Sequence, residues 1–420
     1  MLKHPEVISQ SNSDALQSTE TPSVATFNIL AFVAPWLVVL ALFGYPMVAL
    51  IGTALNVESQ TVSIPFRIAA VVVSVAFFVV SPYTSQWIRQ NYMLLGFWGL
   101  YAGRLVWDWA VADAPGLPTA DYVLLFFTVA CFIPSLALGT ARINLLDDQS
   151  LSLKIAIAGA LTCFLSLAMD RLGLGEDRSL TKLTGRLFFE SLNPITLGHI
   201  GVSTLIALLC LSRKWKFIYA VLIPPLGAAA VICILFSGSR GPIVSLAVCL
   251  AAFIVVSRKW FWVGALLIGL VPLLLDADGI LNQRLSMGID DQSTLGRFTS
   301  QNSAIEMFQE SPVLGSAFAD RDTLSYPHNL FIETAMSMGL VGLMLLFFVL
   351  NTAFRNSLKL FSNRQILIPL LFLQYLIAIQ LSGSIWGSSP LWGLLAILHD
   401  PYYLSKDSEN IESHRAGRRF

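Results

Sequence analysis

The sequence predicts an all-α integral membrane protein, a polytopic bundle of about 12 transmembrane helices. First, 55% of the 420 residues are hydrophobic and only 12% are charged, whereas an ordinary globular chain is about 25% charged. Second, the chain contains about twelve apolar runs that approach or exceed the roughly 17–25 residues needed to cross a bilayer. Third, lysine and arginine gather in alternate connections between these runs, as the positive-inside rule requires. Lipid is therefore the expected solvent of most of the chain.

The composition also excludes several classes of protein. A disordered chain needs low hydrophobicity and high charge. The five cysteines all lie in apolar runs without a CxxC pair, which indicates core residues and neither disulfides nor a zinc site. No phosphate-binding loop, zinc-protease helix or nucleophile elbow occurs, and no basic stripe with interleaved aromatics indicates nucleic acid as a partner. We therefore expect no cofactor and no metal.

The expected elements follow the apolar runs in order. The runs lie near residues 27–55, 64–81, 91–111, 120–139, 152–169, 193–211, 217–236, 241–257, 260–276, 328–352, 365–382 and 388–399. The first run contains Pro35, Gly44 and Pro46, so we expect a kink or a re-entrant piece there, because proline removes a helical hydrogen bond. This predicts a transmembrane domain over 27–400 between two polar tails, 1–26 and 401–420.

The distribution of cations predicts the orientation of the bundle. With an even number of helices both tails lie on one side, and placing them in the cytoplasm keeps most basic connections inside. The inner connections then carry Arg89, Arg142, Arg213, Lys214, Lys216, Arg258, Lys259, Arg355, Lys359 and Arg364. Two longer segments, 170–192 and 277–327, fall outside. Apolar spacing from Phe298 to Phe308 predicts a short helix at the membrane surface within the second segment.

Arg240 is the first candidate for chemistry. It lies in Ser237-Gly238-Ser239-Arg240-Gly241-Pro242, between two apolar runs on the outer side. The planar guanidinium suits phosphate oxygens, and the small residues let a ligand approach the backbone. The alternative is a contact with a lipid headgroup or a carbonyl.

Three further candidates lie in or next to the second outer segment. Arg297 is a second cation there, although alone it could be an ordinary loop residue. His328 follows Pro327 at the start of an apolar helix, where it could take or give a proton near neutral pH or serve as a cap. Glu333 lies farther along the same helix and could neutralise an arginine near the substrate or pair inside the bundle.

The first outer segment and its neighbours supply the remaining candidates. Arg186 is a further phosphate contact, and His199 is expected to make an interhelical hydrogen bond. Arg104 and Asp108 are four residues apart, so they share a helix face and are expected to form an ion pair.

Four motifs, taken together, resemble the O-antigen ligase and polymerase family. The stretch 235–242 resembles its SxSRG helix junction, and the stretch from Arg297 to Gly315 resembles its periplasmic arginine followed by a PxxG turn. The stretch 327–342 is similar to its HNxxxE and GxxG helix start, and 185–194 is similar to its GR and NP segment. The resemblance is close over residues 180–345. A tryptophan common after the loop arginine is missing, so Arg284 or Arg321 could replace Arg297.

The resemblance implies a GT-C-like, metal-independent, inverting glycosyltransferase of the bacterial inner membrane, active on the periplasmic face. The donor would be a glycan on undecaprenyl diphosphate, and the acceptor a glycan or a lipid A core sugar. Arg240 and Arg297 would hold the diphosphate with help from Arg186. His328 would act at the acceptor hydroxyl, and Glu333 would be a further residue that binds substrate. A chain-length regulator and a flippase of the same pathway are the expected partners.

Three functions remain open from the sequence. A polymerase of O-antigen or exopolysaccharide repeat units is slightly favoured, because no feature is tied to a core acceptor. An O-antigen ligase, which moves the finished chain to the lipid A core, uses the same donor chemistry. A solute transporter would show internal repeats and ionisable residues on both sides of the midplane, and no repeat is found.

Overall fold

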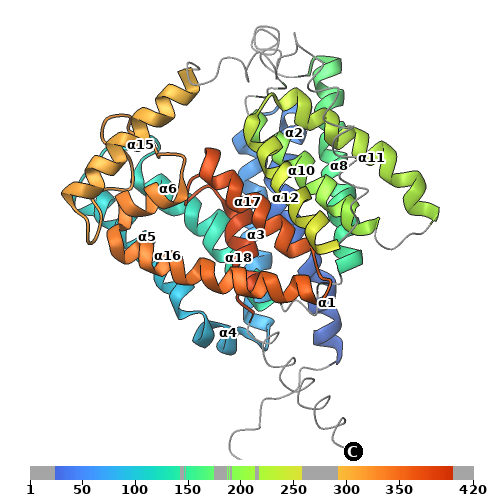
Figure 1. Ribbon diagram of the computed structural model, residues 1–420, viewed down its shortest axis with the longest axis horizontal. Coiled ribbons are helices and arrows are strands. Elements are labelled where there is room, and N and C mark those ends of the chain that lie inside the picture. The colour runs from blue at the N-terminus through green and yellow to red at the C-terminus, as the bar shows by residue number, and fades with distance from the viewer. Residues whose placement is uncertain are drawn as a thin grey trace, which may run out of the picture.

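The computed structural model is a helical bundle (Figure 1) in the residues that it describes, which are 24–141, 146, 148–174, 187, 189, 192–212, 217–257 and 292–400. Its first half contains α1 Val24–Val39, η2 Leu40–Gly44, α2 Tyr45–Ala54, α3 Ser59–Val80, α4 Thr84–Gln90, α5 Tyr92–Ala110, α6 Ala120–Phe126, η3 Phe127–Phe132, α7 Ile133–Thr140 and α8 Asp148–Leu172. Its second half contains α10 Pro194–Leu211, α11 Phe217–Ser237, α12 Arg240–Ser257, α15 Gln292–Glu310, α16 Leu330–Ser362, α17 Leu367–Ser382 and α18 Ser389–Leu398.

The fold confirms an all-α polytopic membrane protein. Within the described ranges, 7 helical stretches are long and apolar enough to cross a membrane: Asn28–Ala54, Gln60–Val80, Ala120–Thr140, Asp148–Leu172, Pro194–Leu211, Arg240–Ser257 and Leu330–Ser362. Three shorter apolar helices are Val221–Ser237, Leu367–Ser382 and Ser389–Leu398. Helix α5 occupies the apolar run expected at 91–111. The run expected at 260–276 lies outside the described residues, so twelve spans stay a prediction.

Proline residues shape two of these spans. The first span is continuous from α1 through α2, with a π-helical turn, η2, directly before Tyr45 and Pro46. A second π-helical turn, η3, precedes Ile133 and Pro134 in the same way. Proline cannot donate a backbone hydrogen bond, and a widened turn accommodates the missing bond. The irregularity expected near Pro46 is therefore a π turn inside one helix.

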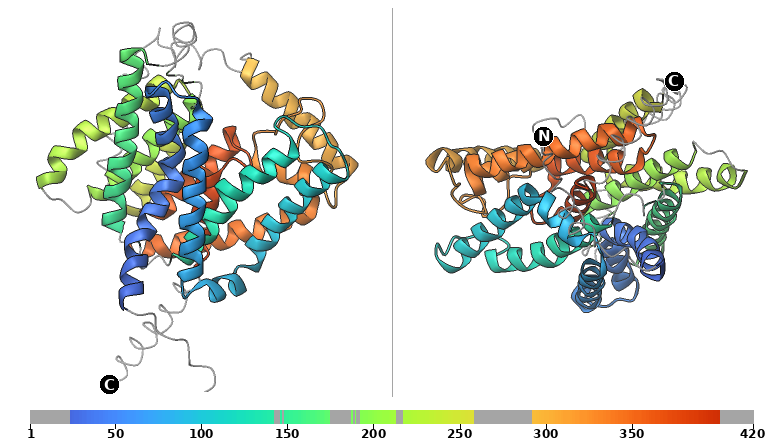
Figure 2. Two further views of the ribbon diagram at one scale, coloured as in Figure 1. Left: turned by 180° about the vertical axis from the view of Figure 1, so that it is seen from behind. Right: turned by 90° about the horizontal axis from the view of Figure 1, so that it is seen from below.

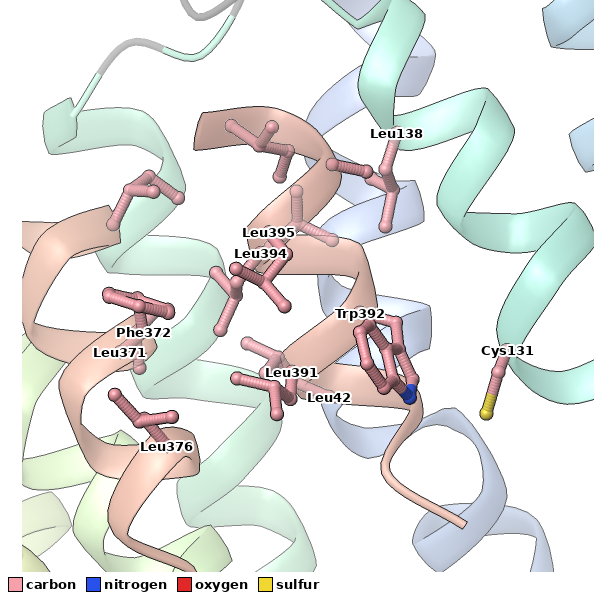
Figure 3. Close-up of a cluster of buried hydrophobic side chains, with 14 of the residues drawn as sticks. Leu42, Cys131, Leu138, Leu371, Phe372, Leu376, Leu391, Trp392, Leu394 and Leu395 are labelled. Atoms are coloured by element: carbon pink, nitrogen blue, oxygen red, sulfur yellow. The ribbon is translucent and has the colours of Figure 1, made fainter. Parts of the chain in front are cut away.

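The hydrophobic core centres on α18. Every residue of α18 from Leu391 to Leu398 is buried, although the helix has only 10 residues. Figure 3 shows Trp392 and its leucines between side chains of η2, η3, α7 and α17. The Trp392 ring lies 5.3 Å from Phe97 and 6.2 Å from Trp98, centroid to centroid. The short helix is thus enclosed by α17 and by the membrane-spanning stretches Asn28–Ala54 and Ala120–Thr140.

The two ends of the bundle differ in structure. Helix α4 lies at one end and α15 toward the opposite end (Figure 1), and the left view in Figure 2 agrees. We name the α15 end the outer end, following the predicted orientation. Helix α15 is the helix expected between Phe298 and Phe308. Its residues Ala304 and Met307 are buried against Ala317 and Met336, so the helix packs onto the start of α16.

Candidate functional site

The site is built around the last residues of α17 and those that follow them, Leu381 to Ile385, which we name the 381–385 segment. Arg297 approaches this segment from α15. Its Nη1 atom donates a hydrogen bond of 2.8 Å to the Leu381 carbonyl oxygen. The carbonyls at a helix C-terminus carry partial negative charge, so this end of α17 is a suitable partner for a guanidinium group. Arg297 is half-buried.

His328 reaches the same segment from the start of α16. Its backbone has a φ of 56°, and Asn329 caps the helix by accepting the amides of Phe331 and Ile332 at 3.0 and 3.1 Å. Burial lowers the pKa of His328, the charge of Arg297 lowers it further, and the backbone of Ser382 acts in the opposite direction as a hydrogen-bond partner. The ring is therefore biased toward its neutral form, which can accept a proton.

The His328 ring also has an aromatic support. Its centroid lies 4.4 Å from that of Tyr326, edge to face, and the Tyr326 ring lies 6.0 Å from Trp386. The buried Nδ1 atom of His328 has no hydrogen-bond partner within the described part of the chain. The ring is therefore oriented by packing, and one of its nitrogens keeps its hydrogen-bonding capacity unused.

Arg240 enters from the junction between α11 and α12. Gly238 has a φ of 55°, a conformation that glycine adopts without strain, and the Ser237 hydroxyl donates to the Ile234 carbonyl over 2.6 Å. Arg240 is the first residue of α12. A Cβ atom on its neighbour Gly241 would lie 3.9 Å from the Leu381 Cβ atom, so the junction lies against the 381–385 segment.

Glu333 contacts the far end of the segment. Its side chain is fully buried, and both carboxylate oxygens accept the Ile385 amide, at 3.1 and 3.0 Å. This contact corresponds to the expected pairing inside the bundle, with a backbone amide as the partner. The Trp392 indole donates to the Ile385 carbonyl over 2.6 Å, so Ile385 is held from both sides.

The 381–385 segment was not among the residues expected from the sequence. Ser382-Gly383-Ser384 repeats the tripeptide Ser237-Gly238-Ser239, and both follow an apolar run at the outer end. The first tripeptide is followed by Arg240 and the second by Ile385, so the second carries no charge that marks it. The repeated tripeptide was the available signal.

The first outer segment is described only in part. Arg186 lies outside the described residues. Leu187, the next residue, donates its amide to the Phe236 carbonyl over 2.8 Å, one residue before the Ser237 junction. Asn193 caps α10 by accepting the Ile195 amide at 2.9 Å.

The interhelical hydrogen bond expected for His199 is made by its backbone and not by its ring. Both ring nitrogens are buried and have no hydrogen-bond partner among the described residues. Only the backbone carbonyl of His199 bonds across helices, by accepting the Gln374 side-chain amide at 2.8 Å. A buried position in a bundle does not by itself place a donor opposite the ring.

Of the two alternatives to Arg297, which are Arg284 and Arg321, only Arg321 belongs to the described residues. Arg284 lies outside the described residues. Arg321 forms an ion pair of 2.7 Å with Glu310, and both side chains are more than half exposed, at 51% and 59%. Its second nitrogen donates to the Ser316 hydroxyl over 2.7 Å. Arg321 thus contacts the surface of the loop between α15 and α16, residues 311–329, which we name the outer loop. Arg297 instead contacts the 381–385 segment.

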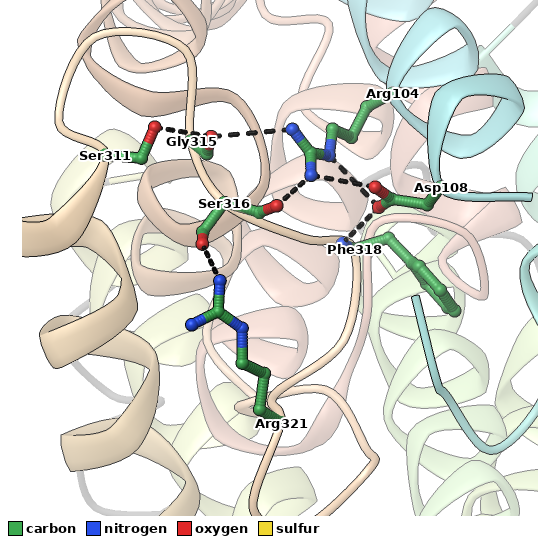
Figure 4. A network of polar contacts seen from close by, with 7 residues as sticks. All are labelled: Arg104, Asp108, Ser311, Gly315, Ser316, Phe318 and Arg321. Atoms are coloured by element: carbon green, nitrogen blue, oxygen red, sulfur yellow. Dashed lines mark hydrogen bonds and ion pairs between the residues drawn. The ribbon is translucent and has the colours of Figure 1, made fainter. Parts of the chain in front are cut away.

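The expected ion pair between Arg104 and Asp108 is confirmed, with 2.7 Å between Nη2 and Oδ1. The pair also anchors the outer loop to α5 (Figure 4): Arg104 donates to the carbonyls of Gly315 and Ser316, and Asp108 accepts the Phe318 amide at 2.8 Å. Asp108 is fully buried. A buried carboxylate needs such partners, since an uncompensated charge is costly in a low dielectric.

A contact between two glycines fixes the same loop to α16. Helix α16 has non-helical backbone at Gly339, with a φ of 62°, and Gly315 has a φ of 76°. A Cβ atom on Gly315 would lie 2.4 Å from the Ser337 backbone, and one on Gly339 would lie 2.4 Å from Val313. Because the helix is interrupted, the Met336 carbonyl accepts the Ser316 amide at 2.7 Å. The PxxG turn and the GxxG helix are therefore two halves of one contact.

The chemistry that this arrangement can perform follows from its groups. Arg297 and the neutral-biased imidazole of His328 contact one segment, and the α11–α12 junction that carries Arg240 packs against the same segment. Guanidinium groups bind phosphate oxygens, often in bidentate geometry, and an imidazole can accept a proton from a hydroxyl. Within the described residues, no group of three His, Cys, Asp or Glu side chains could hold a metal ion.

The fold and the site define a polytopic helical membrane protein with cationic groups at its outer end. Residues 225–347 match a family model described as O-antigen ligase. This part of the chain is therefore similar to the O-antigen ligase family, as the sequence motifs indicated, and the match supports a membrane enzyme that transfers glycan in the O-antigen pathway. The motifs at 235–242, 297–315 and 327–342 fall inside the matched segment. No curated protein matches the chain.

Proposed function

We propose that the protein transfers a glycan from an undecaprenyl diphosphate carrier to a sugar hydroxyl, on the periplasmic face of the bacterial inner membrane. The favoured reaction is polymerisation of O-antigen or exopolysaccharide repeat units. The observation that supports the proposal is that Arg297 and His328 contact the 381–385 segment and that the helix junction carrying Arg240 packs against the same segment, although these residues lie far apart in the sequence.

The proposed reaction divides the work among these residues. The acceptor hydroxyl oxygen attacks the anomeric carbon, and the bond from that carbon to the phosphate oxygen breaks with its electron pair on the leaving diphosphate. Arg240 and Arg297 bind the diphosphate as its charge grows, with Arg186 as a third proposed cation. Fixed donors of this kind contribute several kcal/mol in a site that excludes water.

His328 takes the proton that the acceptor hydroxyl loses. A positioned general base contributes about 10²–10⁴-fold, and the lowered pKa of His328 keeps the ring neutral, as this role requires. Attack from the side opposite the leaving group gives inversion at the anomeric carbon. Glu333 supports the site by holding Ile385, which makes it a positioning residue in this proposal.

The proposal is tested with alanine variants in the host cell. Arg240→Ala, Arg297→Ala and His328→Ala should each abolish surface polysaccharide while membrane insertion, measured by immunoblot of the membrane fraction, stays normal. Arg89→Ala is the matched control, because Arg89 lies on α4 at the opposite end of the bundle. Long-chain polymer in all three site variants would overturn the proposal.

The glycolipids of a deletion strain separate the two transferase reactions. Single repeat units that accumulate on the lipid carrier indicate a polymerase. Long chains that accumulate on the carrier indicate a ligase that acts on the lipid A core. A chain-length regulator and a flippase are proposed partners of either enzyme.

A further inference from the structure

A cavity of about 500 Å³ lies beside the candidate site. Its wall is formed by residues of α1, η2, α2, α3, α6, η3, α7, α10, α17 and α18, and of the connections before α10 and between α17 and α18. Most of the lining is apolar, with side chains such as Leu40, Phe66 and Ile379. Cavities of roughly 300–1,000 Å³ are typical of small-ligand sites. None of the roles proposed above uses this cavity.

Arg67 brings a positive charge to the wall of the cavity. It lies within the membrane-spanning helix α3, where Ser63 and Ser74 are buried while Ile64 and Ile68 are exposed on the lipid side. Spacings of four and seven residues put Arg67 on the same inward face as Ser63 and Ser74. The sequence analysis did not identify this arginine, although it interrupts the apolar run 64–81.

The guanidinium of Arg67 is held by aromatic rings. Its central carbon lies 5.1 Å from the Tyr45 ring centroid and 4.7 Å from the Phe126 ring centroid. No Asp or Glu within the described ranges forms an ion pair with it. A charge inside a membrane span is costly and normally pairs or marks a ligand pathway. The rings orient the cation but leave its charge to be neutralised by another group.

His199 adds a second polar group to the cavity wall. Its side chain is only 6% exposed, and neither ring nitrogen has a hydrogen-bond partner within the described part of the chain. The Tyr375 ring lies 6.3 Å away, centroid to centroid. A buried imidazole without partners loses hydrogen bonds that it would have in water. A bound ligand with oxygen atoms would restore them.

The cavity continues to the candidate site. Ser382 and Gly383 belong to its lining, and they also belong to the 381–385 segment that Arg297 and His328 contact. On the other side, a Cβ atom on Gly241 would lie 3.7 Å from the His199 Nε2 atom. A ligand in the cavity would therefore lie next to the reacting groups.

We propose that this cavity binds one prenyl phosphate lipid, with its phosphate at Arg67, an oxygen near His199 and an isoprenoid segment along the apolar wall. Inorganic phosphate alone would leave the apolar wall unfilled, whereas the isoprenoid segment next to a prenyl phosphate would cover it. The lipid class rests on the proposed function. The bound molecule is either the glycan donor or a lipid-linked acceptor, two sources that share this chemistry.

Binding to the purified full-length protein in detergent tests the proposal. Undecaprenyl phosphate is titrated and detected by native mass spectrometry, with inorganic phosphate as the second probe. Arg67→Gln should weaken undecaprenyl phosphate binding at least tenfold, and Ala70→Phe, which fills the cavity from α3, should do the same. Arg89→Gln should bind as the unmodified protein does. Gel filtration verifies that each variant is folded.

Two results would overturn the proposal: undecaprenyl phosphate binding that neither cavity variant changes, or inorganic phosphate binding that matches lipid binding. An Arg240→Ala/Arg297→Ala double variant identifies the source. Retained, Arg67-dependent binding in that variant identifies a second lipid separate from the donor, and lost binding identifies the donor itself. These measurements need no turnover, so failure of the proposed transfer reaction would be seen separately, as polysaccharide that persists in Arg240→Ala cells.

Discussion

The outer loop and the cavity differ in whether their buried polar groups have partners within the protein. In the loop, Asp108 accepts bonds from Arg104 and from the Phe318 amide, and buried Asp320 accepts bonds from Ser303 and Thr323. In the cavity, Arg67 has no carboxylate partner and His199 no hydrogen-bond partner within the described residues. Both regions hold charged or titratable groups inside the bundle.

This difference distinguishes polar groups that stabilise the fold from polar groups that are available to a ligand. A buried polar group whose partners belong to the protein stabilises one geometry. A buried polar group without partners costs free energy in the unliganded protein, so a ligand is the simplest way to recover that cost. The loop is then the support that fixes α15, and with it Arg297, and the cavity is a place for substrate.

The largest effect is expected at the two glycines that join the loop to α16. Gly339→Ala or Gly315→Ala would place a Cβ atom 2.4 Å from backbone atoms at a positive φ. The strain of that conformation alone costs about 1–3 kcal/mol. The steric clash would in addition push the loop backbone away from α16. We expect little folded protein by gel filtration. Gly103→Ala is the matched control, because nothing lies within 4 Å of its Cβ position; equal behaviour of all three variants would contradict the contact.

Breaking the Arg104–Asp108 pair should have the next largest effect. Removing one partner of a buried pair costs about 3–5 kcal/mol, so Arg104→Ala and Asp108→Ala should each lower the thermal unfolding temperature markedly. In the double variant the unfolding temperature should fall by clearly less than the sum of the two single decreases, because no charge remains uncompensated. Additive losses would show that the two side chains act independently.

A smaller effect concerns the titration of His328. Its folded-state pKa lies below the ordinary value of 6.5, chiefly through burial and then through Arg297. The unfolded chain therefore binds the proton more readily, and His328 lowers stability as the pH falls below 6.5. Arg297→Gln should raise this pKa, measured as the pH dependence of diethyl pyrocarbonate modification at His328 by peptide mass spectrometry. An unchanged midpoint would show that the charge of Arg297 does not affect the pKa of His328.

The smallest effect is expected at Arg321. Its ion pair with Glu310 is exposed, and such pairs contribute about 0–1 kcal/mol. Arg321→Ala should change the unfolding temperature by little, and high salt should weaken the pair further. A loss as large as that of Asp108→Ala would show that the outer loop depends on this surface contact.

The helices were the most predictable part of the molecule. Long apolar runs located each of the described spans, because a membrane segment needs length and hydropathy and little else. The helix α15 was also predictable from the spacing of its apolar residues. The contact between Gly315 and Gly339 was not, since motif letters do not say which backbones touch.

The site was predictable in its residues but not in its geometry. The types and positions of Arg240, Arg297 and His328 identified them as candidates, yet nothing in their spacing identified the 381–385 segment as their common neighbour. Arg67 could have been found, because a charge inside an apolar run is a functional signal by itself. The partners of His199 and Glu333 depend on which groups face them across the bundle.

The comparison of Arg297 with Arg321 tests the central claim most directly. Both arginines lie in the outer region, but one contacts the 381–385 segment and the other the surface residue Glu310. Purified Arg297→Ala and Arg321→Ala proteins would be assayed for glycan transfer from a lipid-linked donor. We predict a loss of at least 100-fold for Arg297→Ala, in the range of removing one charge-stabilising donor, and near-normal transfer for Arg321→Ala. Normal transfer by Arg297→Ala, or an equal loss in both variants, would contradict the account.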